Sequence, residues 1–305
     1  MYEYEFMNSY RIFGNCNDVL GQIFRTNFHG NATLKLLKSS VMIAISGMFR
    51  VYIASILLQI EPSVITCIAG GLIIYSVYTL DRALDSEEDK INRMELDGSR
   101  KEIGLAASIL TFVVGSYVLT KEGMIALAFL PFITGFLYSK GIKIGRFALK
   151  LKGGLGVKNF VVGLTWGAFI TGLAGITCKS IITLSSVFVL YGVKTFVNSV
   201  IDDFKDVKGD SLAGIKTLPI CLGESKTQKL LLSLHLLSHI MLGVALIKGV
   251  IAFEPLVLIG SFICGLICIK DYTKESISRR GITFFKDGES IVTVGLRTIV
   301  NMVLV

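Results

Sequence analysis

Charged residues are scarce in this sequence. Asp, Glu, Lys and Arg make up only 18% of its 305 residues, whereas 52% of the residues are hydrophobic and the mean hydropathy is +0.66. Soluble domains carry about 25% charged residues. The composition therefore excludes an ordinary soluble protein and indicates one that lies in a membrane.

Signatures of several other protein classes are missing. The six cysteines show no CxxC spacing, so we interpret them as free apolar side chains rather than zinc ligands. His235 and His239 lie four residues apart, but the glutamate of an HExxH zinc site is absent. The opening residues contain no apolar core, so we expect the first apolar helix, and not a cleavable signal, to direct the chain to the membrane.

Apolar runs occupy most of the chain. A membrane-spanning helix needs about 17–25 mostly apolar residues. We find nine such runs, at about 41–58, 65–80, 103–119, 123–139, 155–175, 180–201, 228–247, 253–269 and 288–305. The sequence thus predicts an all-α polytopic membrane protein with nine transmembrane helices in a bundle. We expect a single membrane-embedded domain over residues 1–305, of which 1–40 form a cytoplasmic N-terminal segment.

The basic residues are distributed by loop and do not gather in one patch. This argues against a nucleic-acid partner, although the net charge is +8. Most of the 31 lysines and arginines lie before the first run or in every second loop, and the other loops hold only Lys121, Lys179 and Lys248. Because basic loops face the cytoplasm, we predict a multi-pass cell-membrane protein with a cytoplasmic N-terminus and an external C-terminus. Basic loops also suit anionic lipid head groups, and nothing implies a protein partner.

Two acidic segments stand out against this apolar background. "YTLDRALDSEEDKINR" follows the second run and "DDFKDVKGDSLAGIKTLP" follows the sixth, so both lie on the predicted cytoplasmic side. The spacing of three aspartates in each segment would put them on one face of a helix. These six residues are Asp81, Asp85, Asp89, Asp203, Asp206 and Asp210. Four helices separate the two segments, which suggests a four-helix unit used twice.

Carboxylates that face one another suit a hard divalent cation. Mg²⁺ is usually held by one or two carboxylates together with water and substrate phosphates, so it fits sparse aspartates better than Ca²⁺ does. Two Mg²⁺ ions would carry a diphosphate between the clusters. Two solvated acidic loops are the simpler alternative, but matched spacing on one membrane face favours metal binding.

The two segments resemble the motifs of the UbiA superfamily of intramembrane prenyltransferases. "DRALDSEEDKINR" is similar to its first motif, NDxxDxxxD followed by NR, except that Asp81 stands in the Asn position and Arg82 replaces an Asp. The second segment is similar to the second motif and includes its GDxxxGxxTLP tail. The resemblance covers nearly the whole chain. It implies a nine-helix fold and Mg²⁺-dependent transfer of a prenyl group from an isoprenoid diphosphate to a lipophilic acceptor, either aromatic or of the glycerol-ether lipid type.

The residues and the resemblance together give candidate site residues on the cytoplasmic side. The six aspartates would hold the metal, and Asp85, Asp206, Tyr138 and Lys158 would be catalytic. The candidates for binding substrate are Asn92, Arg93, Lys140, Lys158, Asn159, Lys194 and Asn198. A buried Lys158 needs an anionic partner, either the diphosphate or an aspartate. Arg82 should lie off the metal-facing side and act only through the local field.

Other functions remain open from the sequence alone. A transporter also places carboxylates in a helical bundle, but near the membrane midplane. A terpene cyclase of the same fold would let the prenyl chain capture its own cation, and a catalytically silent scaffold is a third possibility. Arg50 and Arg297 lie inside the first and last runs, where a charge indicates a function by default, but the sequence names no partner for either.

The loop charges generate a test of topology. Cysteines introduced singly at positions Lys121 and Lys179 should be labelled by an impermeant thiol reagent from outside the cell, and cysteines at positions Lys205 and Arg279 only after permeabilisation. Labelling of all four from the same side would contradict the nine-helix topology.

Overall fold

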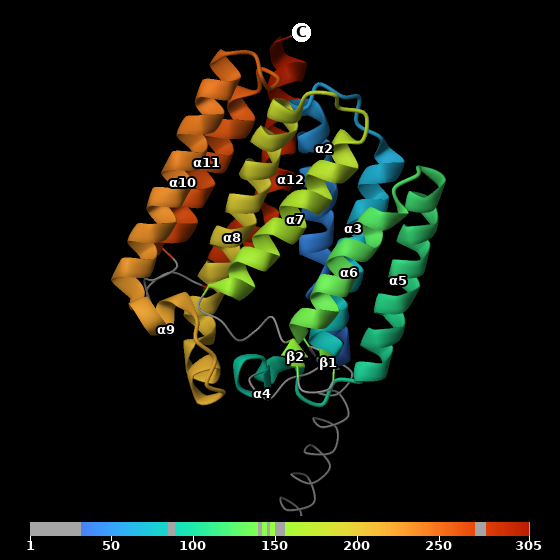
Figure 1. The fold of residues 1–305 in the computed structure, drawn as a ribbon, viewed down its shortest axis with the longest axis vertical. Coiled ribbons are helices and arrows are strands. Elements are labelled where there is room, and N and C mark those ends of the chain that lie inside the picture. Colours follow the sequence, from blue (N-terminus) through green and yellow to red (C-terminus); the bar gives the residue numbers. More distant parts are fainter. Residues whose placement is uncertain are drawn as a thin grey trace, which may run out of the picture.

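The computed structural model describes residues 32–84, 89–139, 142–144, 147–149, 156–271 and 279–304. The chain in these ranges is almost entirely helical (Figure 1). The helices are α2 (Val41–Leu57), α3 (Val64–Ala83), α4 (Asp89–Asn92), α5 (Lys101–Lys121), α6 (Ile125–Ser139), α7 (Val157–Gly175), α8 (Ile181–Leu212), α9 (Leu218–Leu222), α10 (Glu224–Ile247), α11 (Pro255–Asp271) and α12 (Arg279–Leu304). Residues 32–38 are also helical, and a 3₁₀ turn covers Met94–Leu96. Two short strands, β1 (Ile142–Ile144) and β2 (Phe147–Leu149), pair as an antiparallel hairpin.

Each of the nine predicted apolar runs coincides with one helix. These helices are α2, α3, α5, α6, α7, α8, α10, α11 and α12. The all-α class is therefore confirmed. The number of membrane crossings is not, because six helices of the described part are long and apolar enough to span a bilayer. Nine crossings, the repeated four-helix unit, the single domain and the orientation of the termini stay predictions.

The prediction that three aspartates of the first acidic segment share one helix face is wrong. Helix α3 ends at Ala83 and α4 begins at Asp89, so Asp81 and Asp89 belong to different helices. Four of the next six residues, 84–89, are acidic, and repulsion between like charges disfavours a continuous helix. The second segment behaves as predicted, because α8 continues to Leu212 and carries its aspartates on the last turns.

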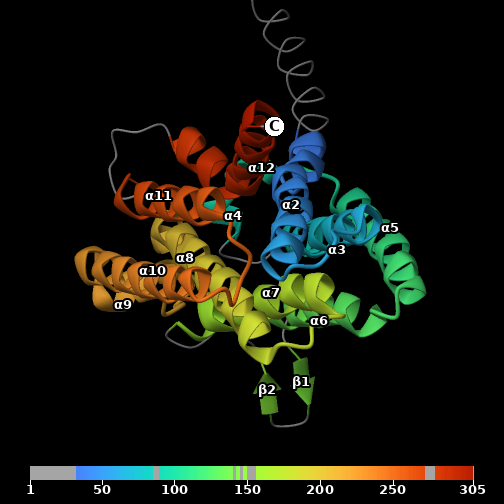
Figure 2. The same cartoon turned by 90° about the horizontal axis from the view of Figure 1, so that it is seen from above.

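The helices pack side by side in a bundle. Viewed from above, α2, α3, α6, α7, α8, α10, α11 and α12 follow one another around the bundle, and α12 returns to pack against α2 (Figure 2). Helix α5 packs outside against α3. Phe169, Ile170 and Ile73 are fully or almost fully buried in the core. By contrast, α5 and α10 expose rows of large apolar side chains, as a surface in contact with lipid tails requires.

Small residues bring α7 and α8 close together. A Cβ atom added at Gly163 would lie 2.8 Å from the carbonyl oxygen of Gly192, and one added at Gly167 would lie 3.0 Å from the Gly192 Cα. Small residues let helix backbones approach closely in a membrane, where apolar burial between helices gives little driving force. This contact sets the spacing of two helices that carry polar residues at the same end of the bundle.

The contact predicts a difference between two glycine substitutions. Gly163→Ala should lower the thermal unfolding midpoint in detergent, because the methyl group meets backbone and overpacking costs about 1–3 kcal/mol. Gly243→Ala is the matched control, since no atom lies within 4 Å of its added Cβ. The control should leave the midpoint unchanged or raise it, because alanine favours helix over glycine. Equal midpoints for the two variants would contradict the close approach.

Candidate active site

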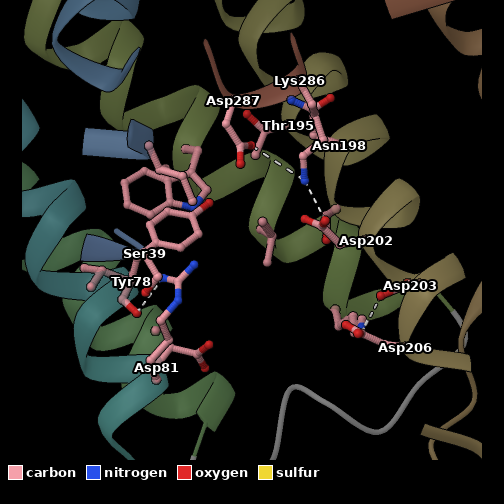
Figure 3. Close-up of a pocket in the computed structure, with 18 of the residues that line it drawn as sticks. Ser39, Tyr78, Asp81, Thr195, Asn198, Asp202, Asp203, Asp206, Lys286 and Asp287 are labelled. Atoms are coloured by element: carbon pink, nitrogen blue, oxygen red, sulfur yellow. Dashed lines mark hydrogen bonds and ion pairs between the residues drawn. The ribbon is translucent and has the colours of Figure 1, made fainter. Parts of the chain in front are cut away.

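A cavity of about 560 Å³ lies at the end of the bundle where both acidic segments occur. Side chains from α2, α3, α7, α8 and α12 line it. Figure 3 shows Asp81 of α3 on one side and the α8 aspartates Asp203 and Asp206 on the other. Two segments that are far apart in the sequence therefore contribute carboxylates to one space.

The two acidic segments also contact each other directly. The Asn92 side chain donates a hydrogen bond of 3.4 Å to Asp210 Oδ1. Gly209 makes room for this approach, because a Cβ atom there would lie 2.2 Å from Asn92 Oδ1. Arg93, the next residue, forms an ion pair of 3.0 Å with Asp81. The tail of the first segment thus connects the end of α3 to the end of α8.

Lys158 is buried beside the second segment. Its ammonium lies 2.6 Å from Asp203 Oδ1 and 3.6 Å from Asp210 Oδ2, and only 6% of the residue is exposed. Asn159 donates hydrogen bonds to the other Asp203 oxygen, at 2.9 Å, and to Ser199 at 3.0 Å. Of the two partners expected for Lys158, the structure shows aspartate. Lys158 also lines the cavity, whereas Asp210 is not among the lining residues.

Helix α12 contributes residues that the sequence analysis did not select. Lys286 is buried, lines the cavity and places its ammonium 2.5 Å from Asp202 Oδ1. Lys205 approaches the same oxygen at 2.8 Å, and Asp287 also lines the cavity. The apolar run was expected to begin at 288, but α12 starts at Arg279. The sequence alone shows only a lysine and an aspartate just before an apolar run, which does not single out Lys286.

Aromatic side chains form another wall of the cavity. The rings of Tyr78 and Trp166 stack with centroids 5.6 Å apart. The Arg82 guanidinium lies 5.7 Å from the Tyr78 centroid and donates hydrogen bonds to Ser40 Oγ and to the Tyr78 carbonyl oxygen. Arg82 also lines the cavity. The expectation that it acts on the metal site only through the local field stays a prediction. The Arg82 guanidinium thus lies near the ring of Tyr78, one helical turn earlier in α3.

The remaining candidates fall into two groups. Asn198 lines the cavity, whereas Lys194 of the same helix does not: its ammonium pairs with Glu289 of α12 and donates to Ser261 Oγ at 3.0 Å. This buried pair ties α8 to α11 and α12. Asp85 and Lys140 lie outside the described residues, as do the side chains of Asp89 and Tyr138.

The fold and the cavity define a class of protein: a polytopic helical membrane protein in which aspartates from two separate segments face one polar cavity. The chain belongs to the UbiA prenyltransferase family, which it matches over residues 40–286. The resemblance seen in the two motifs is confirmed.

Three relatives illustrate this membership. The digeranylgeranylglyceryl phosphate synthase of Sulfolobus acidocaldarius is 29% identical over 165 residues, which cover 52% of this chain and 54% of the relative. The synthase of the same name from Sulfurisphaera tokodaii is 34% identical over 184 residues, covering 56% and 59%. The matches thus span little more than half the length of these curated relatives. A UbiA homologue from Archaeoglobus fulgidus, solved with GPP and Mg²⁺ bound, shares the fold with a TM-score of 0.61, 14% identity and coverage of 87% and 97%.

The Lys158 contacts predict a large effect on stability. Lys158→Met should lower the free energy of unfolding by about 3–5 kcal/mol, because it leaves Asp203 buried without its cation. Adding Asp203→Asn to this variant should recover part of the loss. Lys205→Met is the matched control and should cost about 0–1 kcal/mol, because its pair with Asp202 is partly exposed and Lys286 remains. Thermal unfolding in detergent measures all three, and equal losses in the two single variants would refute the assignment.

Proposed function

We propose that this protein transfers a prenyl group from an isoprenyl diphosphate to the hydroxyl of a lipophilic acceptor of the glyceryl phosphate type. The observation that carries the proposal is the meeting of Asp81 with Asp203 and Asp206 in one cavity whose other walls are cationic and aromatic. The acceptor class comes from the names of the two curated relatives. Family membership supports the reaction type.

The chemistry of the cavity suits Mg²⁺. Its carboxylates offer oxygen atoms, the ligands that Mg²⁺ prefers. In the described part of the chain, no three acidic, histidine or cysteine side chains lie close enough together to hold a metal ion, and Asp85 falls outside that part. We propose that the six aspartates predicted from the two motifs hold two Mg²⁺ ions. The bound metal would offset negative charge on the departing diphosphate.

The proposed reaction breaks one bond and forms another. The bond between the allylic carbon and the diphosphate oxygen breaks, and the diphosphate leaves with the electron pair. The acceptor hydroxyl oxygen then bonds to that carbon, and its proton passes to a carboxylate of the cavity. Arg93 and Lys286 would stabilise the negative charge that develops on the diphosphate.

The aromatic wall has a second task in this proposal. Tyr78 and Trp166 present ring faces, which attract cations, and together with Val77 and Val162 they limit access of water to the allylic carbon. Both substrates dissolve in the membrane, so they can reach a cavity among helices without crossing water. Analysing products formed from the diphosphate alone separates this transfer from cyclisation of the prenyl chain.

The proposal predicts which aspartates matter. Asp206→Ala and Asp85→Ala should each lower the transfer rate at least about a hundredfold, because a metal-assisted effect of several kcal/mol is lost, and EDTA should abolish turnover. Asp81→Asn keeps an oxygen ligand and should retain most activity while requiring somewhat more Mg²⁺. Asp97→Ala, an exposed change outside the cavity lining, is the control and should be neutral. Full activity in EDTA, or in Asp206→Ala, would exclude this mechanism.

A further inference from the structure

Arg50 lies deep in the bundle. It stands ten residues after Ser40, whose hydroxyl contacts Thr79 Oγ1 at 2.9 Å, so the level of Ser40 along the bundle matches the end of α3. Ten helical residues span roughly 15 Å. Arg50 is therefore well inside the candidate span Ala32–Leu57. It is only 8% exposed, yet it lines the same cavity as the aspartates.

Most other cations of the cavity have an acidic partner. Lys158 pairs with Asp203, Lys286 and Lys205 pair with Asp202, and Arg93 pairs with Asp81. Arg82 instead donates to Ser40 and to the Tyr78 carbonyl. These contacts account for the positive charge around the acidic end of the cavity.

Arg50 differs from all of them. Nowhere in the described ranges does a side chain or backbone group form a hydrogen bond or ion pair with it, and its Nε is buried without a partner. Arg297, the other arginine of an apolar run, binds both carboxylate oxygens of Glu254 at 2.9 and 2.6 Å. A buried charge inside a membrane protein is costly unless an anion accompanies it. An anion that enters the cavity would supply the partner that Arg50 lacks in the described part of the chain.

The position of Arg50 indicates that this anion is not the diphosphate. Asp81 lies two residues beyond Thr79, at the outer end of the cavity, so the aspartates and Arg50 occupy different levels. Side chains of a helix lean toward its N-terminus, which for α2 is the end near Ser40. The guanidinium therefore points back toward the aspartates. A group held by Arg50 would lie next to the reacting centre without replacing the diphosphate.

We propose that Arg50 binds the phosphate of the lipid acceptor and thereby selects an acceptor with an anionic head group. This inference rests on the proposed function. A guanidinium presents two parallel N–H groups to two phosphate oxygens, a geometry that lysine cannot reproduce. In a glyceryl phosphate lipid, the phosphate is only a few bonds from the hydroxyl that would attack. The contact between Arg50 and the phosphate would therefore position both the head group and the attacking hydroxyl.

The test compares Arg50→Gln with Arg297→Gln, the matched loss of an arginine that does not line the cavity. Transfer is measured with a prenylated glyceryl phosphate, with its dephosphorylated counterpart, and with varied diphosphate. In Arg50→Gln, KM for the phosphorylated acceptor should rise at least tenfold, KM for the diphosphate should change less than about twofold, and the preference for the phosphorylated acceptor should disappear. Arg297→Gln should keep the preference. Arg50→Lys keeps the positive charge and serves as a second variant if Arg50→Gln does not fold. Its KM for the phosphorylated acceptor should lie between the values of the wild type and Arg50→Gln.

Two results would overturn the inference. One is a rise in KM for the diphosphate alone, which would assign Arg50 to the donor; the other is an unchanged acceptor preference in Arg50→Gln. Calorimetric binding of the prenylated glyceryl phosphate, without diphosphate, separates this inference from the proposed function. If the wild type binds this lipid and Arg50→Gln does not, but the wild type shows no transfer, the proposed function is rejected and the Arg50 assignment is supported.

Discussion

A carboxylate at the end of an apolar bundle is stable only when a cation or water offsets its charge, and this constraint organises the site. Asp203 lies against Lys158 of α7, and Asp202 lies against Lys286 of α12. Because the members of each pair come from different helices, the pairs hold α7 and α12 against α8. The same cations line the cavity in which we propose that the diphosphate binds. In that proposal, the charge pairs that hold the helices together also supply positive charge for an anionic substrate.

The backbone makes these pairs possible. Glycines at 163, 167 and 192 bring α7 and α8 into contact, so Lys158 and Asn159 reach Asp203 over a short distance. On the other side, the Lys194–Glu289 pair joins α8 to α12 one turn from Lys286. Close packing on one side and a buried ion pair on the other fix the walls of the cavity. Polar contacts alone would not fix the positions of these walls, because a long lysine side chain can reach a carboxylate across a range of distances between helices.

The cavity has two levels with different chemistry. Its outer end collects the aspartates and their cations, Arg50 lies deeper, and the stacked rings of Tyr78 and Trp166 form a further wall. In the proposed reaction, the diphosphate belongs to the first level and the carbocation and acceptor to the second. Both proposed substrates are lipids, so they could reach a site among membrane helices from the phase in which they dissolve.

The sequence by itself determined the helical class, the position of every long helix and the two acidic segments, because apolar length and aspartate spacing are local properties of the chain. It also indicated Lys158, Asn159 and Asn198. It could not indicate Lys286, since the partner of that lysine lies on α8, 84 positions away. It placed Lys194 in the site, although Glu289 holds it elsewhere. Which cation meets which carboxylate, and that Arg50 meets none in the described part of the chain, was decided only by the tertiary structure, because the packing of distant helices sets the separation of charges.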